Sequence, residues 1–268
     1  MKTHIIINNL RCALGQQKNG VDLGGDVIIN KLQSLNQMTQ SAINTIEFKS
    51  SAIYDGYTQT YNQIYSIIDQ NFVLNLGGDH SVGACTIQPL LDKYKDNVLI
   101  IWIDAHADAN TMETSPSQNT HGMPVAPLLG IMNHWYKLSR QPHLLNPSNL
   151  LYVGIRDLDP GEIELIDRLN IKYFKDFTPE TIRWVNAHPA SKIHISLDID
   201  GIDPQHMPST GTLSHHGLNM DDVIAIITES NPRLISMDLV EFNPLVGTKK
   251  DQEITLGNIV EILDCFRQ

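Results

Sequence analysis

Eight short apolar runs recur along this chain, and most of them are separated by a longer stretch with helical apolar spacing. The runs lie at residues 4–8, 44–48, 72–76, 98–103, 150–155, 171–174, 192–199 and 233–240. Several are continuously apolar rather than alternating, which is typical of strands covered on both faces. Helices are expected at residues 26–35, 59–69, 82–94, 160–169, 179–187, 220–230 and 252–266. This alternation predicts an α/β fold with a largely parallel sheet.

The alternation runs from end to end without a repeat, a low-complexity tract or a linker-like change of composition, so we expect residues 1–268 to form a single domain. Eight strands with intervening helices can close into a barrel or lie in an open sheet, and periodicity does not separate these arrangements. In both of them ligands bind at the C-terminal ends of the strands.

Composition narrows the partners that such a chain can have. The net charge of -11 argues against nucleic-acid binding through a broad basic surface and is compatible with a small cationic substrate. No apolar run approaches the roughly 20 residues of a membrane span, so we expect no membrane contact. Cys12, Cys85 and Cys265 are far apart in the sequence, which favours reduced thiols and a cytoplasmic location.

Three predicted strands end in acidic residues and histidines. Residues two apart in an extended segment share a face, so each strand end would present its polar side chains together. Buried carboxylates are costly unless they are paired or bound to a cation. The sequence therefore predicts a metal centre at these strand ends. Its candidate ligands are His80, Asp104, His106, Asp108, Asp198 and Asp200.

Four carboxylates and two imidazoles are more ligands than one ion normally recruits. Two divalent cations that share bridging carboxylates, roughly 3.5–4 Å apart, fit this number. A carboxylate-dominated set without thiolates suits Mn²⁺, with Zn²⁺, Fe²⁺, Co²⁺ and Ni²⁺ as alternatives. A single strand end of this kind is usually a loop or a cap, but three of them together favour a metal site.

The motifs GGDHS, DAHADAN, the HG of NTHGMPV and SLDIDGIDP, in this order, resemble those of the ureohydrolase family, and within it the arginases. GQQKNGVDLGG near the start and VEFNP near the end extend the resemblance over nearly the whole chain. The resemblance implies a three-layer α/β/α fold around a central, mostly parallel eight-stranded sheet. It also implies a homo-oligomer, with a trimer favoured.

The resemblance further implies two Mn²⁺ ions per subunit that share Asp104 and Asp198 as bridging ligands. Each ion has two ligands of its own, His80 and Asp108 for one and His106 and Asp200 for the other. A hydroxide that bridges the two ions would attack the guanidinium carbon of the substrate. Asp108 would also accept a hydrogen bond from this hydroxide.

Two further residues carry catalytic roles by the same resemblance. Glu241, in VEFNP, is similar to the carboxylate that holds the substrate guanidinium, whose fork of donors it matches. By itself, Glu241 would be a strand-end charge paired with a surface lysine. His121 matches the position of the family's proton shuttle. An imidazole suits protonation of the leaving amine because its unperturbed pKa lies near neutrality.

The remaining implied contacts concern the α-amino acid head of arginine. Asn110 and Ser117 match positions that contact the α-carboxylate, and Asp159 matches the position that faces the α-amino group. Glu162 would assist through water, and Thr212 would line the pocket wall. The spacing between Asn110 and the histidine of NTHGMPV favours arginine over agmatine.

Three functions follow from these expectations. The first is an Mn²⁺-dependent hydrolase that converts L-arginine and water to L-ornithine and urea. The second is a sister ureohydrolase that acts on agmatine, guanidinobutyrate or formiminoglutamate with the same metals. The third is a non-catalytic regulatory relative, which would be expected to lack ligands that this chain retains.

Overall fold

A single parallel sheet of eight strands runs through the computed structural model, which describes residues 4–37, 41–50, 53–136 and 141–265. The strand order is β2-β1-β3-β8-β7-β4-β5-β6, and every neighbouring pair is parallel. The strands are β1 (Ile5–Arg11), β2 (Ser41–Glu47), β3 (Phe72–Gly77), β4 (Val98–Ile103), β5 (Leu150–Val153), β6 (Lys172–Phe174), β7 (Lys192–Asp198) and β8 (Leu234–Val240). All eight strands predicted from the apolar runs are confirmed.

The seven predicted helices are also confirmed, with ends that shift by a few residues. The α-helices are α1 (Gly24–Ser34), α2 (Ile53–Ile67), α3 (Gly83–Tyr94), α4 (Val125–Leu128), α5 (Pro160–Leu169), α6 (Pro179–Ala187), α7 (Met220–Ser230) and α8 (Lys249–Asp264). Helix α4 was not predicted, because four residues are too few to display a helical period. Phe266, the predicted end of the last helix, lies outside the described residues.

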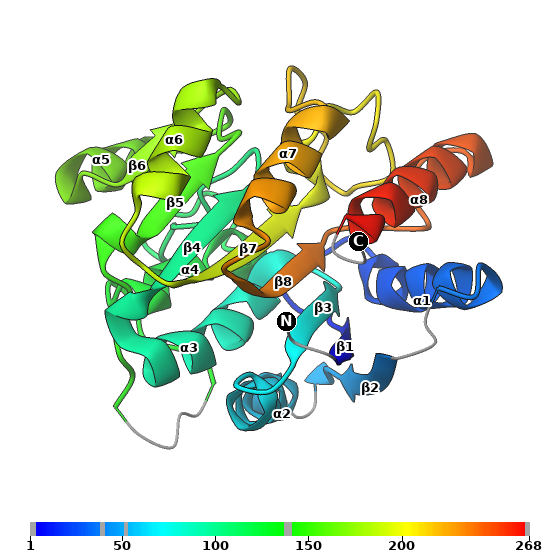
Figure 1. Ribbon diagram of the computed structural model, residues 1–268, viewed down its shortest axis with the longest axis horizontal. Coiled ribbons are helices and arrows are strands. Elements are labelled where there is room, and N and C mark those ends of the chain that lie inside the picture. Colours follow the sequence, from blue (N-terminus) through cyan, green and yellow to red (C-terminus); the bar gives the residue numbers. More distant parts are fainter. Residues whose placement is uncertain (1–3, 38–40, 51–52, 137–140, 266–268) are drawn as a thin grey trace.

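Helices cover both faces of the sheet, so the fold is an open three-layer α/β/α arrangement and not a barrel (Figure 1). One apolar core joins the sheet to α1, α6, α7 and α8, and a second joins the opposite face to α2, α3, α4 and α5. Every residue of β3, β4, β5 and β8 is buried, which explains why these strands are mainly apolar and do not alternate. None of the helices in the described ranges has the length and hydropathy that a bilayer crossing needs.

Four neighbouring strands determine where the polar side chains of the strand ends meet. Strands β3, β8, β7 and β4 lie side by side in the sheet, although they are distant from one another in the sequence. Adjacent strands are separated by roughly 4.8 Å, so the C-terminal ends of these four lie within reach of one another. The predicted ligands and Glu241 follow these strands directly.

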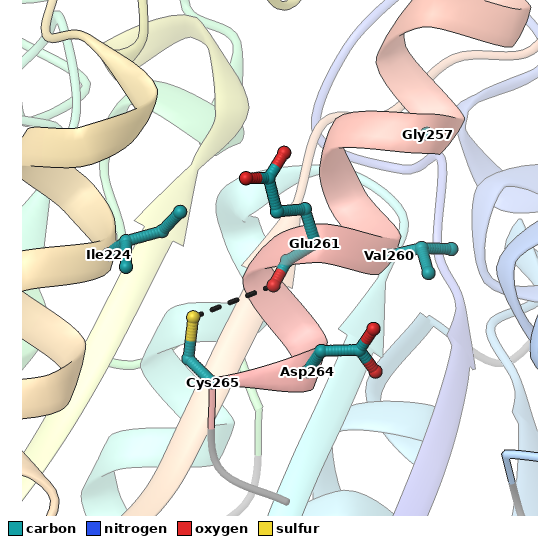
Figure 2. Close-up of a pocket in the computed structure, with 6 residues that line it drawn as sticks. All are labelled: Ile224, Gly257, Val260, Glu261, Asp264 and Cys265. Carbon is teal, nitrogen blue, oxygen red and sulfur yellow. Dashed lines mark hydrogen bonds between the residues drawn. The ribbon is translucent and has the colours of Figure 1, made fainter. Parts of the chain in front are cut away.

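A separate surface pocket of about 390 Å³ lies between α7 and α8 (Figure 2). It is lined by Ile224, Gly257, Val260, Glu261, Asp264 and Cys265. The thiol of Cys265 donates a 3.5 Å hydrogen bond to the backbone carbonyl of Glu261. The groups of residues that could hold a metal in the described part of the chain lie elsewhere, at the strand ends.

Candidate metal centre and active site

The turn after β3 presents His80 because its glycines allow close packing against the end of β1. A Cβ at Gly78 would overlap the carbonyl of Cys12, so only glycine fits there. The next residue, Asp79, accepts a 3.0 Å hydrogen bond from the backbone N–H of Ser81 and caps a single 3₁₀ turn. The turn leaves His80 fully buried beneath the pocket floor.

Hydrogen bonds shape the turn at the end of β4 and of β7, and the two ends are joined by a bond of 3.2 Å from the Ala105 N–H to Asp200 Oδ1. Asp104 accepts a 2.7 Å hydrogen bond from the backbone N–H of His106, and Asp198 accepts one of 2.8 Å from the N–H of Asp200. Gly201 packs against the backbone of Asp104, where an added Cβ would lie 2.8 Å from the Asp104 Cα. These contacts fix the two strand ends against each other.

The predicted ligands form two adjoining clusters that share one carboxylate. The first is His80, Asp104 and Asp108, and the second is Asp104, His106 and Asp200. His80 Nδ1 lies 3.0 Å from oxygens of both Asp104 and Asp108. His106 Nδ1 lies 3.3 Å from oxygens of Asp104 and Asp200. The two clusters are what a pair of cations with a bridging carboxylate requires.

Asp198, the second predicted bridging ligand, adjoins the first cluster. Its Oδ2 lies 3.4 Å from His80 Nδ1, and its side chain is 5 % exposed. The Asp198 carboxylate therefore lies beside a ligand of the first cation, and the backbone bond to Asp200 links it to the second cluster.

The hydrogen bonding of His80 shows that these residues fit a cation. Ser196 Oγ donates to Asp238, so it accepts the 2.9 Å hydrogen bond from His80 Nε2–H. The other ring nitrogen, Nδ1, is buried without a hydrogen-bond partner and faces carboxylate oxygens. A ring nitrogen that faces carboxylate oxygens is stabilised when a positive charge lies between them, which either a proton or a metal cation supplies.

The acid–base balance of the centre indicates the same attraction for positive charge. Burial works to lower the pKa of His80, but the adjoining carboxylates of Asp104, Asp108 and Asp198 raise it well above its ordinary value. Burial and the repulsion of Asp104 raise the pKa of Asp200 to about 7. Carboxylates crowded in this way are stabilised by divalent cations.

A pocket of about 230 Å³ opens above the two clusters and is strongly acidic. It is lined by His106, Asp108, Asn110, Ser115, Ser117, His121, Gly122, Asp157, Asp159, Glu162, Asp198, Asp200, Thr212 and Glu241. Every residue predicted to contact substrate is among them, from the loops after β4, β5, β7 and β8. Ser115 and Asp157 were not predicted, because they lie in loops without a periodic signal.

Glu241 and His121 form a pair at one side of this pocket. His121 Nδ1 lies 3.1 Å from Glu241 Oε1, and the Glu241 side chain is 4 % exposed. Burial works to lower the pKa of His121, but the hydrogen bond to Glu241 and its negative charge raise that pKa to about 9. A surface lysine partner for Glu241, the alternative from the sequence, is not found among the described ion pairs.

The residues predicted for the α-amino acid head also line the pocket. Asn110 Nδ2 donates a 2.9 Å hydrogen bond to Asp159 Oδ2, so these two side chains are in direct contact. Glu162 accepts backbone N–H groups on both oxygens, from Ala109 at 3.0 Å and from Asp159 at 3.1 Å. Burial raises the pKa of Glu162 to about 7. Glu162 thus joins the loop after β4 to the start of α5.

Two residues support the centre without having been singled out in the sequence. The indole N–H of Trp102 donates to Asp104 at 3.0 Å, and its ring stacks on His80 at 4.0 Å. Arg156 donates only to backbone carbonyls, including that of Asp200 at 2.7 Å. Apolar strand residues and a loop arginine have no distinctive spacing, so their partners became visible only in three dimensions.

The fold and the centre together define an open α/β protein whose strand ends can hold a pair of neighbouring metal ions beneath an acidic pocket. Residues 4–265 match the model of the arginase family. The chain belongs to this family.

Its relatives include proteins of known structure. An arginase from Entamoeba histolytica is 34 % identical over 247 residues, covering 86 % of this chain and 78 % of the relative. Its crystal structure in complex with L-ornithine has a TM-score of 0.84 at 30 % identity and covers 98 % of this chain and 97 % of that one. The arginase structure from Bacillus subtilis has a TM-score of 0.85 at 30 % identity, with 98 % of both chains covered.

The chain spans about half the length of some relatives. An arginase from Plasmodium berghei is 39 % identical over 192 residues, which cover 66 % of this chain and 54 % of the relative. The predicted family and the predicted fold class are confirmed by these comparisons.

Proposed function

We propose that this protein is a hydrolase that converts L-arginine and water to L-ornithine and urea, with two Mn²⁺ ions as cofactors. The observation that carries the proposal is the acidic pocket whose floor consists of two metal-binding clusters sharing Asp104. A guanidinium is cationic and planar, and such a pocket attracts it to the place where the cations lie. Membership of the arginase family supports the same reaction.

The proposed ligands are divided between the two cations as their positions in the sheet suggest. Asp104 and Asp198 would serve both cations, and the other four ligands, His80, Asp108, His106 and Asp200, would serve one cation each. When bound, two divalent cations supply a nucleophile from water at neutral pH. The preference for Mn²⁺ rests on a donor set of carboxylates and imidazoles without thiolates.

The chain's own residues then orient the substrate and supply the proton that the leaving amine receives. Glu241 holds the guanidinium over the centre by accepting an N–H donor. Asp108 accepts a hydrogen bond from the attacking water and directs it at the guanidinium carbon. His121 donates a proton to the leaving amine, for which its raised pKa of about 9 is favourable because the imidazole carries that proton at neutral pH.

Selectivity for an α-amino acid head is proposed to come from other residues that line the pocket. Asn110 and Ser117 donate to the α-carboxylate, and Asp159 attracts the α-ammonium group. Glu162 supports Asp159 through its backbone, and Thr212 lines the wall. The direct contact between Asn110 and Asp159 supports this proposal, because it brings a donor and a carboxylate to one place.

We further propose that residues 1–268 form one domain that works in the cytoplasm as a homo-oligomer, with a trimer favoured. The three free cysteines support a reducing compartment. Light scattering coupled to size-exclusion chromatography measures the oligomer directly, and a mass near that of one chain would contradict it.

One side-by-side assay tests the reaction. Mn²⁺-loaded protein is incubated with arginine, agmatine, guanidinobutyrate and formiminoglutamate, and the release of urea or formamide is measured. We expect urea from arginine at the highest kcat/KM. Hydrolysis of one of the other substrates without hydrolysis of arginine would favour a sister ureohydrolase, and activity on none of them would favour a non-catalytic relative.

A further inference from the structure

A residue of the N-terminal loop contacts the carboxylate proposed to hold the substrate. The amide Nε2 of Gln16 donates a 2.6 Å hydrogen bond to Glu241 Oε2, across 225 positions of sequence. Glu241 is 3 % exposed, so its carboxylate depends on protein donors rather than on bulk water. None of the roles proposed above involves Gln16.

Protein donors occupy all but one of the hydrogen-bond positions on the Glu241 carboxylate. Glu241 Oε1 accepts hydrogen bonds from the backbone N–H of His80 at 2.9 Å and from His121 Nδ1 at 3.1 Å. Oε2 accepts the bond from Gln16. A carboxylate has about four lone-pair positions, so one position on Oε2 remains for a substrate N–H.

Gln16 determines the direction of that remaining position. The terminal torsion of a glutamate is broad, so the two donors on Oε1 do not by themselves fix the plane of the carboxylate. A donor on each oxygen does fix it, and Gln16 supplies the donor that Oε2 receives from the described residues. The orientation of Glu241 toward a guanidinium therefore depends on Gln16.

The loop that carries Gln16 is anchored by the residue before it, Gly15. The N–H of Gly15 donates to Asp79 Oδ2 at 2.8 Å, and its carbonyl accepts the N–H of His121 at 3.2 Å. A Cβ at Gly15 would lie 2.5 Å from Asp79 Oδ1, so the loop approaches as only glycine allows. On its other side Gln16 Oε1 lies near Gly211, where an added Cβ would be 3.2 Å away.

We propose that Gln16 is a positioning residue for guanidinium recognition. Its side chain orients the Glu241 carboxylate so that one lone pair of Oε2 receives the substrate. The inference rests on the proposed function, because it assumes that Glu241 binds a guanidinium group. It adds a specific role for the glycine-rich N-terminal loop, which joins Glu241 and His121 through two consecutive residues.

The test compares Gln16→Met with the same substitution at the next residue, Gln17→Met. Methionine keeps the length of glutamine and removes the N–H donor, and Gln17 is exposed. We expect Gln16→Met to raise KM for arginine roughly tenfold, the effect of losing one hydrogen bond to a charged group, with a smaller change in kcat. The unfolding temperature and the Mn²⁺ content should match those of the wild type and of Gln17→Met.

An unchanged KM for Gln16→Met would overturn the proposal, whatever happens to the unfolding temperature. A loss of kcat and stability at constant KM would also overturn it, because that pattern indicates a purely structural role. If the wild type hydrolyses none of the four substrates, the proposed function fails separately. Calorimetry then measures the affinity of methylguanidinium for the same Mn²⁺-loaded proteins. Equal affinities of the wild type and Gln16→Met would overturn the positioning role of Gln16.

Discussion

Two residues at the centre have a backbone conformation that only glycine adopts readily. Asp108 has a φ of 50° and Glu241 a φ of 67°, both in the left-handed region. Each costs on the order of 1–2 kcal/mol relative to a relaxed conformation. Both side chains line the pocket. The cost of their backbone conformation is offset by the bonds that hold them in place, such as the 2.9 Å bond from the His80 N–H to Glu241.

Selectivity for arginine can be tested at Asp159. Replacing its carboxylate by Asp159→Ala removes the group proposed to attract the α-ammonium of arginine, which guanidinobutyrate lacks. We expect the ratio of kcat/KM for arginine to that for guanidinobutyrate to fall by roughly ten- to a hundredfold. Glu164→Ala, at an exposed position of α5, is the control and should leave the ratio unchanged. A ratio that stays at the wild-type value in Asp159→Ala would contradict the assignment.

His134 should make stability depend on pH. Burial lowers its pKa to about 4, and neither ring nitrogen has a hydrogen-bond partner. The folded state therefore resists protonation, so stability is lost as the pH falls from the unfolded pKa of about 6.5 toward 4. Relative to His134→Phe, the wild type should lose up to about 2 kcal/mol of unfolding free energy between about pH 7.5 and pH 5. Urea unfolding of the two proteins across this pH range measures the difference. The same dependence of unfolding free energy on pH in both proteins would refute the prediction.

The elements are joined beneath the centre by a buried network of polar side chains. Asp238 of β8 accepts bonds from Asn75 of β3 at 2.7 Å and from Thr86 of α3 at 2.6 Å. It also faces His194 of β7 at 3.2 Å and the hydroxyl of Ser196, which contacts His80. His194 is fully buried within this network. The network fixes three neighbouring strands in the register that brings their ends together.

Two glycines should respond to the same substitution in opposite directions. Gly257 lies in α8 with nothing within 4 Å of an added Cβ, beside the pocket of Figure 2. Gly257→Ala should stabilise the fold by about 0.5–1 kcal/mol, because alanine is the better helix former. Gly78→Ala should destabilise it by about 1–3 kcal/mol or more, because its Cβ overlaps the Cys12 carbonyl. Urea unfolding measures both, and a stable Gly78→Ala variant would show that β1 and β3 can separate at their ends.

On the scale of the whole molecule, the metal centre should contribute to global stability. Buried carboxylates from β4 and β7 repel one another, and burial with this repulsion raises the pKa of Asp198 and Asp200. Cations that bind only the folded state add about 2.7 kcal/mol at a hundredfold excess over Kd. We expect chelation to lower the unfolding temperature by several degrees and Mn²⁺ to restore it.

Asp104→Asn provides the matched control for that experiment, because it changes the shared ligand with almost no change of shape. Its unfolding temperature should depend much less on Mn²⁺ than that of the wild type. Equal unfolding temperatures of the wild type with and without Mn²⁺ would argue against a structural contribution of the centre.

The sequence by itself determined the elements and the kinds of ligand. Continuous apolar runs specify buried strands, and acidic residues at alternate positions after them specify cation ligands, because both signals depend only on local spacing. The predicted strand, the pair Asp104 and Asp108, and the histidine between them all follow from residues 98–108 alone.

Only the tertiary structure decided which strand ends meet and what supports them. Periodicity does not encode strand order, so the adjacency of β3, β8, β7 and β4 came from the crossovers of the fold. The contact of Gln16 with Glu241 and the bonds of Arg156 to backbone carbonyls join segments that are far apart in the sequence. Such contacts form when the helices pack on both faces of the sheet, because a polar group buried by that packing is stabilised by a hydrogen-bond partner or a cation.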